Sequence, residues 1–360
     1  EKNILKHNDY WDLINLDKKT PINYLINLDY NKFSDILKNK KFNIVDEKIF
    51  DEMNDDWYKL LKDYPVKNCK IKDKCFDIIV KDYKFVNGNL FLSKFNDVCI
   101  LFIKLNQKYK NLYLPKKEKK LKNYDIDTKG YENTLPLYIS NNFDAFPWII
   151  LYRSNNIHSI HSELNDLMVK ASKNKKYRFG FSFISILIPN VILHANILIF
   201  DFKNNTMERF EPFGNLYKMN EDLDISLEKK FKDFTYIKPN DYLPTSGFQT
   251  LADENVEVNQ KPGDIGGFCL AWCFWYLEHR IINKDVEPKK LVEKMIKKIK
   301  YSDLSFINYI RNYANTINNL RYNYLKKIGI KKDILSNISF DHDIENKINK
   351  SILDYHVKNT

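Results

Sequence analysis

The sequence predicts an α+β protein in which a mixed β-sheet packs on one apolar helix, with an N-terminal extension before this core. Three observations support this fold class. Apolar strand-like runs are concentrated between residues 146 and 213. An apolar helix-like run, GGFCLAWCFWYLEHRI, follows at residues 266–281. The Lys- and Asn-rich pattern of residues 288–360 is amphipathic, which is typical of helices.

Length and composition fit a globular protein with a core of ordinary size. The chain has 360 residues, of which 44% are hydrophobic and 14% aromatic, and this content excludes a disordered chain. We divide it into an N-terminal accessory region (1–135), a core domain (136–287) and a C-terminal helical region (288–360). A Lys-rich segment at 115–122 and a Lys-Gly pair at 129–130 mark the first boundary.

The accessory region alternates short helical patterns with strand-like runs around a turn at Asn87-Gly88. One of these runs, DVCILFIKL at residues 97–105, is predicted to be a strand because it is apolar and short. We assign the region no function from its sequence.

The core domain contains four strand-like runs, which are FPWIILYR (146–153), RFGFSFISILIP (178–189), VILHANILIFDF (191–202) and MERFEPF (207–213). A short amphipathic helix, SIHSELNDLMVKAS, is predicted between the first two runs, with Ser159 as its N-cap. A second helical pattern, LEKKFKDF, follows the last strand. Pro189-Asn190 predicts the turn between the second and third strands.

An imidazole and a carboxylate occupy the hairpin formed by the last two strands. Strand alternation puts His194 and Asn196 on one face, and a turn with an even number of residues puts Glu211 on the same side. Asp201 lies about 23 Å from His194 by strand rise and is a poor partner for it. A carboxylate beside an imidazole holds its tautomer and stabilises the imidazolium. His194 and Glu211 are therefore a candidate catalytic pair.

A cysteine nucleophile would complete such a site. Cys269 lies where the apolar helix is predicted to start, directly after Gly266-Gly267 and Phe268. Backbone amides and the macrodipole at a helix N-terminus stabilise a thiolate. Cys273, one helical turn further, is surrounded by aromatic residues and is expected to be a buried, inert thiol.

A preorganised glutamine amide could form an oxyanion hole together with the Cys269 backbone N–H. Two glutamines precede the helix, Gln249 by 20 residues and Gln260 by 9 residues. Gln249 is slightly favoured because Gly247-Phe248 gives it an apolar anchor, but the sequence leaves both candidates open.

The hairpin HANILIFDFKNNTMERFEPFG and the later GGFCLAWCFW resemble the adenain-like cysteine proteases. This clan, known as CE, includes proteases of SUMO and other ubiquitin-like proteins and the processing proteases of large DNA viruses. The resemblance covers residues 180–285 and suggests a viral origin. The chain departs from the familiar members in three respects. Leu270 stands in place of a glycine after the cysteine, Ala195 stands in place of a tryptophan after the histidine, and neither glutamine lies at the usual spacing of about six or seven residues before the cysteine.

This resemblance implies a papain-like cysteine protease whose Cys-His-Glu triad cleaves peptide or isopeptide bonds after small residues such as Gly-Gly. Cys269 would attack the carbonyl, His194 would protonate the leaving amine, Glu211 would orient His194, and Gln249 or Gln260 would stabilise the oxyanion. The implied substrates are a viral polyprotein or a ubiquitin-like conjugate, the latter cleaved by a deubiquitinase or deSUMOylase. The alternative is a non-catalytic nucleic-acid-binding or scaffold protein that retains this fold.

The net charge of the chain indicates which binding partners are plausible, and its cysteine content indicates the cellular compartment. The formal charge of +11 would suit an anionic partner such as nucleic acid. Five irregularly spaced cysteines form no disulfide framework, which favours a reducing compartment. No run approaches about 18 uninterrupted apolar residues, so we expect no membrane segment. The expected location is cytoplasmic, meaning the host cytoplasm, a viral factory or the virion if the protein is viral.

The sequence predicts neither a metal site nor an organic cofactor. His158 and His161 could be imagined as metal ligands together with Cys69 and Cys75, but these spacings match no strong zinc pattern.

Overall fold

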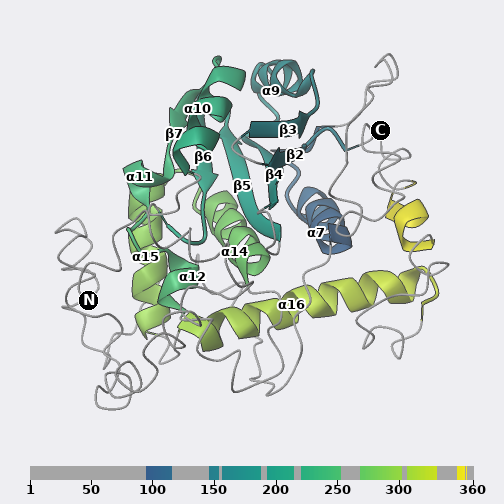
Figure 1. The fold of residues 1–360 in the computed structure, drawn as a ribbon. Coiled ribbons are helices and arrows are strands. Elements are labelled where there is room, and N and C mark those ends of the chain that lie inside the picture. Colours follow the sequence, from purple (N-terminus) through teal and green to yellow (C-terminus); the bar gives the residue numbers. More distant parts are fainter. Residues whose placement is uncertain are drawn as a thin grey trace, which may run out of the picture.

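The computed structural model places one β-sheet between two layers of helices (Figure 1). The residues that it describes are 95–115, 146–153, 156–187, 193–214, 220–252, 268–301, 306–330, 347–352 and 354. Mixed α and β structure with a mixed sheet is confirmed. The predictions for residues 1–94, including the turn at Asn87-Gly88, lie outside the described residues.

The sheet is seven-stranded. Its strands are β1 (Leu112–Tyr113), β2 (Ile149–Arg153), β3 (Asn156–Ile160), β4 (Phe179–Leu187), β5 (Leu193–Asp201), β6 (Thr206–Phe210) and β7 (Thr235–Ile237). They are ordered β3-β2-β4-β5-β6-β7, and β1 also pairs with β4. The β1/β4, β2/β4 and β6/β7 pairs are parallel, whereas β2/β3, β4/β5 and β5/β6 are antiparallel.

The centre of the sheet is the long antiparallel pair of β4 and β5, whose register runs from Phe179↔Asp201 to Leu187↔Leu193. Successive β5 side chains alternate between the two faces, so that Ile197 joins the hydrophobic core on one side and Leu198 joins the core on the other. Strands buried on both faces read as continuous apolar runs, which explains the sequence pattern of both strands.

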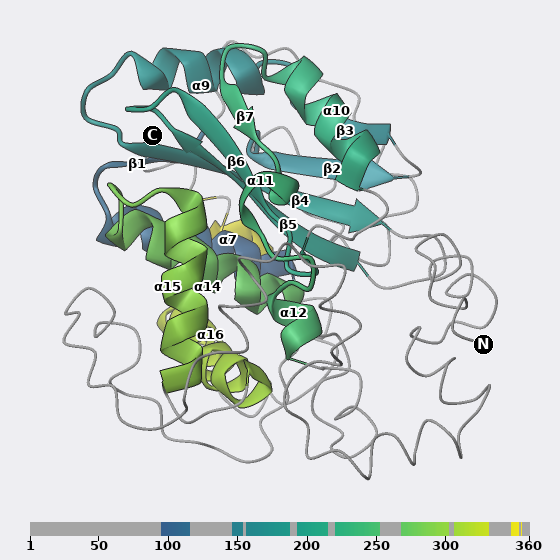
Figure 2. The same ribbon diagram turned by 90° about the vertical axis from the view of Figure 1, so that its left-hand side faces the viewer.

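Helices cover both faces of the sheet (Figure 2). On one face lie α9 (Leu164–Ser172) and α10 (Asn220–Lys230). The other face is covered by α7 (Phe95–Lys108), α14 (Cys269–Ile282), α15 (Pro288–Tyr301) and α16 (Phe306–Lys327), with the short helices α11 (Pro239–Tyr242) and α12 (Phe248–Leu251) near the end of β6. None of the helices in the described part of the chain is long and apolar enough to cross a membrane.

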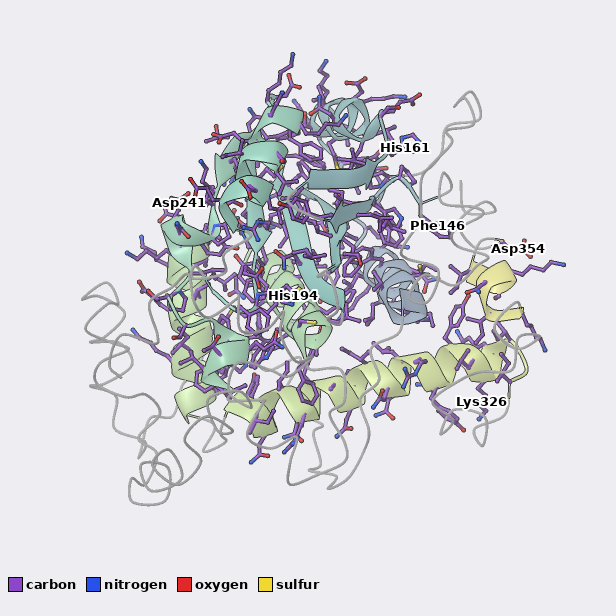
Figure 3. All side chains as sticks on the ribbon, in the orientation of Figure 1. Phe146, His161, His194, Asp241, Lys326 and Asp354 are labelled. Atoms are coloured by element: carbon purple, nitrogen blue, oxygen red, sulfur yellow. The ribbon has the colours of Figure 1, made fainter. Side chains whose placement is uncertain are left out.

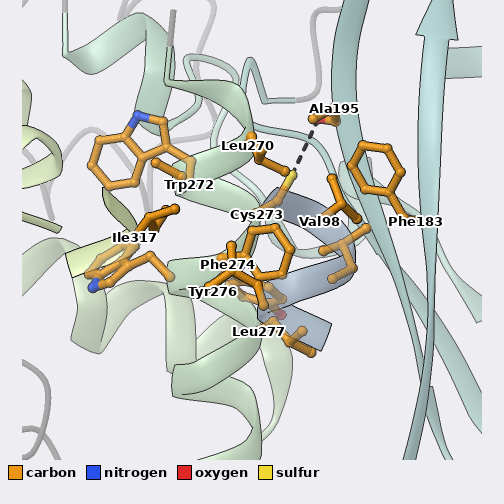
Figure 4. Close-up of a cluster of buried hydrophobic side chains, with 14 of the residues drawn as sticks. Val98, Phe183, Ala195, Leu270, Trp272, Cys273, Phe274, Tyr276, Leu277 and Ile317 are labelled. Carbon is orange, nitrogen blue, oxygen red and sulfur yellow. Dashed lines mark hydrogen bonds between the residues drawn. The ribbon is translucent and has the colours of Figure 1, made fainter. Parts of the chain in front are cut away.

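Helix α14 is buried between the sheet and the outer helices, and Figure 4 draws part of this packing. The rings of Trp272 and Trp275 lie 5.2 Å apart, and both contact Phe248 of α12 at 5.3 and 5.4 Å. Burial of a large apolar side chain contributes about 1.5–3 kcal/mol. The aromatic contacts therefore hold α14 firmly, and with it the cysteine at its first position.

Two predictions about local structure are wrong. The apolar run at residues 97–105 is not a strand but part of helix α7, because a short apolar run fits a buried helix as well as a strand and only its packing distinguishes them. Ser159 does not cap a helix, because it lies in β3, and α9 begins five residues later at Leu164 with Glu163 as its N-cap.

Helix α7 and strand β1 belong to the sequence range predicted as an accessory region, and both contact the central structure. β1 pairs with β4, and α7 contacts α14 and α16. Helices α15 and α16, from the predicted C-terminal region, also contact α14. The boundaries at residues 135 and 287 remain predictions.

Candidate active site

The candidate site lies at the end of the sheet where β5 begins and β6 ends, beside the N-terminus of α14. His194 is the second residue of β5, and Glu211 directly follows β6. Cys269 is the first residue of α14, and its side chain is close enough to His194 to raise the pKa of that histidine. Figure 3 labels His194 in this region. The fold thus brings together three residues that the sequence predicted as a triad.

The hairpin connecting β5 and β6 sets the register of His194 and Glu211. Asp201 pairs with Thr206, so residues 202–205 form an even-numbered turn, as expected, and Asn205 adopts a left-handed conformation with φ of 53°. The two side chains consequently share a face, and His194 Nε2 lies 2.6 Å from Glu211 Oε1. The His194 ring also stacks on Phe213, with centroids 4.7 Å apart.

Asp201 serves a different purpose at the far end of the strand. Its carboxylate accepts hydrogen bonds from Arg178 and from Arg280 near the C-terminus of α14. Arg280 also donates to Glu208 of β6 at 2.9 Å, and Tyr276 donates to the same carboxylate. This buried ionic cluster fixes α14 to the sheet.

The Glu211 carboxylate is buried and surrounded by donors. Besides His194, the backbone N–H of Phe213 donates to Oε1 at 2.9 Å, and Asn196 Nδ2 donates to Oε2 at 2.9 Å. Arg209 Nη1 lies 3.5 Å from Oε2. Burial alone would raise the pKa of Glu211, but the charge of His194, its hydrogen bond and the charge of Arg209 outweigh burial and lower that pKa.

His194 is shifted toward its charged form. Burial by itself lowers the pKa of His194, but the Glu211 charge and the hydrogen bond with the Cys269 side chain raise the pKa to about 10. A protonated imidazole donates from both ring nitrogens. Nε2 is directed to Glu211, and Nδ1 is the second donor of the charged ring. This arrangement is suited to an imidazolium that lies near a cysteine side chain.

The second cysteine of α14 is buried, as expected. Cys273 Sγ donates a hydrogen bond to the carbonyl oxygen of Ala195 at 3.3 Å (Figure 4). Burial raises the pKa of Cys273 well above its ordinary value, so the group remains a neutral thiol. The contact joins α14, one turn below Cys269, to the residue that follows His194.

Gln249 lies beside the turn that follows Glu211. Its backbone N–H donates to the Pro212 carbonyl at 2.9 Å, and the Gly247 N–H donates to the Phe213 carbonyl at 2.9 Å. A Cβ atom at Gly247 would lie 2.2 Å from the Gly214 nitrogen, so the two chain segments approach closely only because Gly247 lacks a side chain. The Gln249 backbone is therefore next to the turn that follows Glu211, whereas Gln260 and Gly266-Gly267 lie outside the described residues.

The histidines considered as metal ligands are separate from this site. His161 is buried, and its Nδ1 accepts a hydrogen bond from the Glu163 backbone N–H at 3.3 Å. The His158 side chain, Cys69 and Cys75 lie outside the described residues. Across the residues that the structure does describe, no group of three or more His, Cys, Asp or Glu side chains could hold a metal ion.

Two polar neighbours of the triad, Asn196 and Arg209, were not predicted as site residues. Both could have been found from strand alternation, because Asn196 lies two residues after His194 and Arg209 lies two residues before Glu211. Residues two positions apart on a strand face the same side of the sheet. A polar residue two positions from a candidate catalytic residue therefore indicates a neighbour in the site.

Comparison with known proteins found a partial match. A putative ankyrin repeat protein of Acanthamoeba polyphaga mimivirus is 38% identical to this chain over 183 residues, which correspond to 46% of the chain and 24% of that protein. The chain thus spans about a quarter of the length of this curated relative. No protein-family profile matches the chain. No solved structure matches it either.

These findings correct the family that the sequence motifs suggested. Assignment to the adenain-like and ubiquitin-like-protein proteases is wrong, because the curated relative reported above bears the name of an ankyrin repeat protein. The resemblance depended on a hairpin and a helix start, which are short segments. Leu270 and Ala195 already departed from the pattern at the residues next to the cysteine and the histidine.

Proposed function

We propose that this protein is a thiol hydrolase that cleaves peptide or isopeptide bonds, with Cys269 as nucleophile, His194 as proton carrier and Glu211 as the group that orients His194. The observation that carries the proposal is the buried His194–Glu211 pair at 2.6 Å, beside a cysteine at the first position of a helix whose side chain also raises the pKa of His194. Nucleophile, base and orienting acid within hydrogen-bond reach are the signature of an activated nucleophile.

The reaction follows from these positions. The Cys269 thiolate attacks the carbonyl carbon of the scissile bond and forms a tetrahedral intermediate. Collapse of the intermediate breaks the C–N bond as the His194 imidazolium gives its proton to the leaving amine, leaving a thioester. The neutral imidazole then takes a proton from water, which attacks the thioester and releases the acid and the thiolate. Glu211 stays ionised throughout and keeps His194 aligned.

The Cys269 backbone N–H at the helix N-terminus is a suitable donor for the oxyanion. The position of Gln249 supports its assignment as the second oxyanion donor, because its backbone N–H donates to the carbonyl of Pro212, the residue after Glu211. Gln260 remains the competing candidate. A comparison of Gln249→Ala with Gln260→Ala decides between them, since loss of an oxyanion donor lowers kcat by about 10²–10³.

We also propose that the fold is papain-like. The arrangement that supports this is a nucleophile at the N-terminus of a helix packed on a sheet whose central strand bears the histidine. A protein substrate with small residues such as Gly-Gly before the scissile bond fits the site best, because Cys269 and His194 are only 5% and 4% exposed. A viral polyprotein and a ubiquitin-like conjugate are the two substrates to compare.

A non-catalytic scaffold or nucleic-acid-binding role is the second candidate function. It is favoured by the formal charge of +11 and by the name of the relative, since repeat proteins present extended binding surfaces. Steep salt-dependent binding of DNA by a chain whose Cys269 is unreactive would support this role. The reactivity of the Cys269 thiol therefore distinguishes the catalytic function from the binding function.

Alkylation of the folded protein by iodoacetamide tests the proposed function without knowledge of the substrate. Each cysteine is followed by mass spectrometry from pH 4 to 9. We expect Cys269 to react faster than Cys99 and Cys273 at neutral pH, and His194→Ala to slow Cys269 selectively. Equal rates at all three cysteines, or no effect of His194→Ala, would refute the catalytic role.

Substrate cleavage provides the direct test. Peptide libraries and ubiquitin-type Gly-Gly electrophiles are offered to the wild-type chain, to Cys269→Ala and to the matched control Cys273→Ala. We expect a covalent adduct and turnover in the wild type and in Cys273→Ala, and neither in Cys269→Ala. Activity that survives in Cys269→Ala and is lost in Cys273→Ala would assign the nucleophile to the second cysteine.

A further inference from the structure

We propose that Asn196 is a positioning residue for the triad and that Arg209 determines which way its side-chain amide points. The inference rests on the proposed thiol hydrolase function and adds a residue that neither touches substrate nor carries a proton. In this role, the buried Asn196 amide holds the Glu211 carboxylate in the orientation in which it accepts a hydrogen bond from His194.

The orientation of the Asn196 amide follows from the chemistry of its neighbour. Arg209 Nη1 lies 2.6 Å from Asn196 Oδ1. A guanidinium has only donors, so the atom that faces it must be the amide oxygen. The amide nitrogen is then directed the other way, where it donates to Glu211 Oε2 and to the Ala195 carbonyl, both at 2.9 Å. Exchange of the amide atoms would set two donors against each other at the Arg209 end and would set the amide oxygen against two acceptors, Glu211 Oε2 and the Ala195 carbonyl, at the other.

Arg209 is itself held by a second layer of partners. Its Nε and Nη2 donate to Asp224 Oδ1 of α10 at 2.9 and 2.7 Å, and Tyr236 of β7 donates to the same oxygen at 2.6 Å. The Arg209 side chain is fully buried. Burial opposes its charge, but Tyr236, Asp224 and Glu211 raise the pKa of Arg209 above its ordinary value. The guanidinium is a permanent, fixed cation.

These contacts divide the two oxygens of Glu211 between two tasks. Oε2 faces Asn196 and Arg209, whereas Oε1 faces His194 and the Phe213 N–H. Donors on both sides prevent rotation of the carboxylate, because any rotation would break several charge-assisted hydrogen bonds inside a buried site. Oε1 is therefore kept directed at His194 Nε2 before substrate binds.

Loss of the Asn196 amide should alter the titration of the site. In Asn196→Leu, Glu211 loses a donor that stabilises its charged form and can turn away from His194. The imidazolium is then less stabilised, so the pKa of His194 falls below about 10. Since the imidazolium faces the attacking sulfur, the rate of Cys269 alkylation at pH 6 should fall about tenfold, as loss of one hydrogen bond to a charged group predicts.

The experiment measures two quantities on the full chain, the titration of the His194 ring by NMR and the alkylation rate of Cys269 against pH. The variants are Asn196→Leu, the isosteric Asn196→Asp and the control Glu208→Gln. Glu208 lies in the same strand as Arg209 and forms a buried ion pair with Arg280, but it belongs to the cluster at the far end of α14. Its carboxylate accepts hydrogen bonds from Tyr276 and Arg280 rather than from the donors around Glu211, so this variant controls for the loss of a buried ion pair.

We expect Asn196→Leu to shift the His194 titration and to slow Cys269 alkylation, and we expect Glu208→Gln to leave the His194 titration unchanged. Asn196→Asp keeps the shape of the side chain, so it remains testable if the leucine variant does not fold. Its carboxyl group can donate to Glu211 only while protonated, so alkylation should approach the wild-type rate at low pH and diverge as the group ionises. Titrations of Asn196→Leu or Asn196→Asp that coincide with those of the wild type would overturn the proposal.

Failure of the inference is distinguishable from failure of the proposed function. If Cys269 is alkylated no faster than Cys99 in the wild type, and if His194→Ala does not change its rate, the thiol hydrolase function is refuted and the inference with it. If Cys269 is alkylated rapidly and His194→Ala slows this reaction, but substitution of Asn196 does not, only the positioning role of Asn196 is refuted.

Discussion

At the scale of single residues, the candidate site consists of opposite charges that stabilise each other away from water. Burial acts against the charged forms of both His194 and Glu211, yet the pKa of the imidazole is raised and that of the carboxyl group is lowered. Each shift depends on the other residue, because the two groups are 2.6 Å apart and almost fully buried. The two groups therefore titrate as a coupled pair, and replacement of either residue should change the pKa of the other.

Replacement of the carboxylate should weaken catalysis without abolishing it. In Glu211→Gln the charge that raises the pKa of His194 is lost, so that pKa should fall toward the ordinary value of 6.5. The imidazole can still carry a proton, so we expect hydrolysis to be slowed by one to several orders of magnitude, up to about 10⁴-fold. NMR titration of His194 and the rate of hydrolysis provide the two measurements. An unchanged rate would remove Glu211 from the site.

The same pair should make stability depend on pH. The raised pKa of His194 contributes stability that is complete below the ordinary value of 6.5 and is lost as pH rises toward about 10. The lowered pKa of Glu211 contributes stability that is present above its ordinary value of 4.5 and is lost as pH falls through the shifted value. The contribution of the pair should therefore be largest between pH 4.5 and 6.5.

Urea unfolding at several pH values checks this expectation. We compare the wild type with the double variant His194→Gln, Glu211→Gln, which removes both titrating groups. The difference in unfolding free energy between the two proteins should shrink from pH 6 to pH 9. Curves that run parallel across this range would show that the pair is not coupled in the folded protein.

At the scale of elements, the site depends on how a helix, a hairpin and a short loop are held against one another. The second turn of α14 is tied to β5 through Cys273 and Ala195, and its last turns are tied to the sheet through Arg280 and Glu208. The turn after β6 is tied to α12 by backbone hydrogen bonds beside Gly247. Each element is thereby positioned by contacts that lie outside the triad.

Gly247→Ala should disturb the site through the backbone. The new Cβ would lie 2.2 Å from the Gly214 nitrogen and 2.3 Å from the Pro212 oxygen, so the two segments must separate. We expect a loss of about 1–3 kcal/mol in stability and slower alkylation of Cys269. Gly180→Ala is the control, because its Cβ would meet only the Phe202 and Met168 side chains. A similar effect of both variants on Cys269 would contradict the expectation.

At the scale of the whole molecule, one hydrophobic core joins elements that are far apart in the sequence. Phe102 of α7, Phe274 of α14 and Ile310 of α16 belong to the same buried cluster. Their contact implies that the elements on this face of the sheet unfold together rather than as separate regions.

This cooperativity can be measured with single substitutions. We expect Phe102→Ala, Phe274→Ala and Ile310→Ala each to lower the unfolding free energy by about 2–5 kcal/mol while the chain still unfolds in one transition. Circular dichroism and tryptophan fluorescence should give coincident urea curves. A separate early transition in Phe102→Ala or Ile310→Ala would instead indicate that the corresponding helix is an independent unit.

Local patterns in the sequence were sufficient for the hairpin and for the start of α14. Strand alternation and an even-numbered turn put His194 and Glu211 on one face, because the side-chain period of a strand leaves no other choice once the register is known. The buried state of Cys273 followed in the same way from its aromatic neighbours and its distance from the helix end.

Other features were decided only by tertiary structure. The apolar run of α7 became a helix because it packs against α14 and α16, which local propensity does not reveal. The orientation of Asn196 depends on Arg209, and Arg209 in turn depends on Asp224 and Tyr236 from separate elements. Hydrogen bonds between buried side chains have no sequence period, so they exist only once the strands and helices are in place.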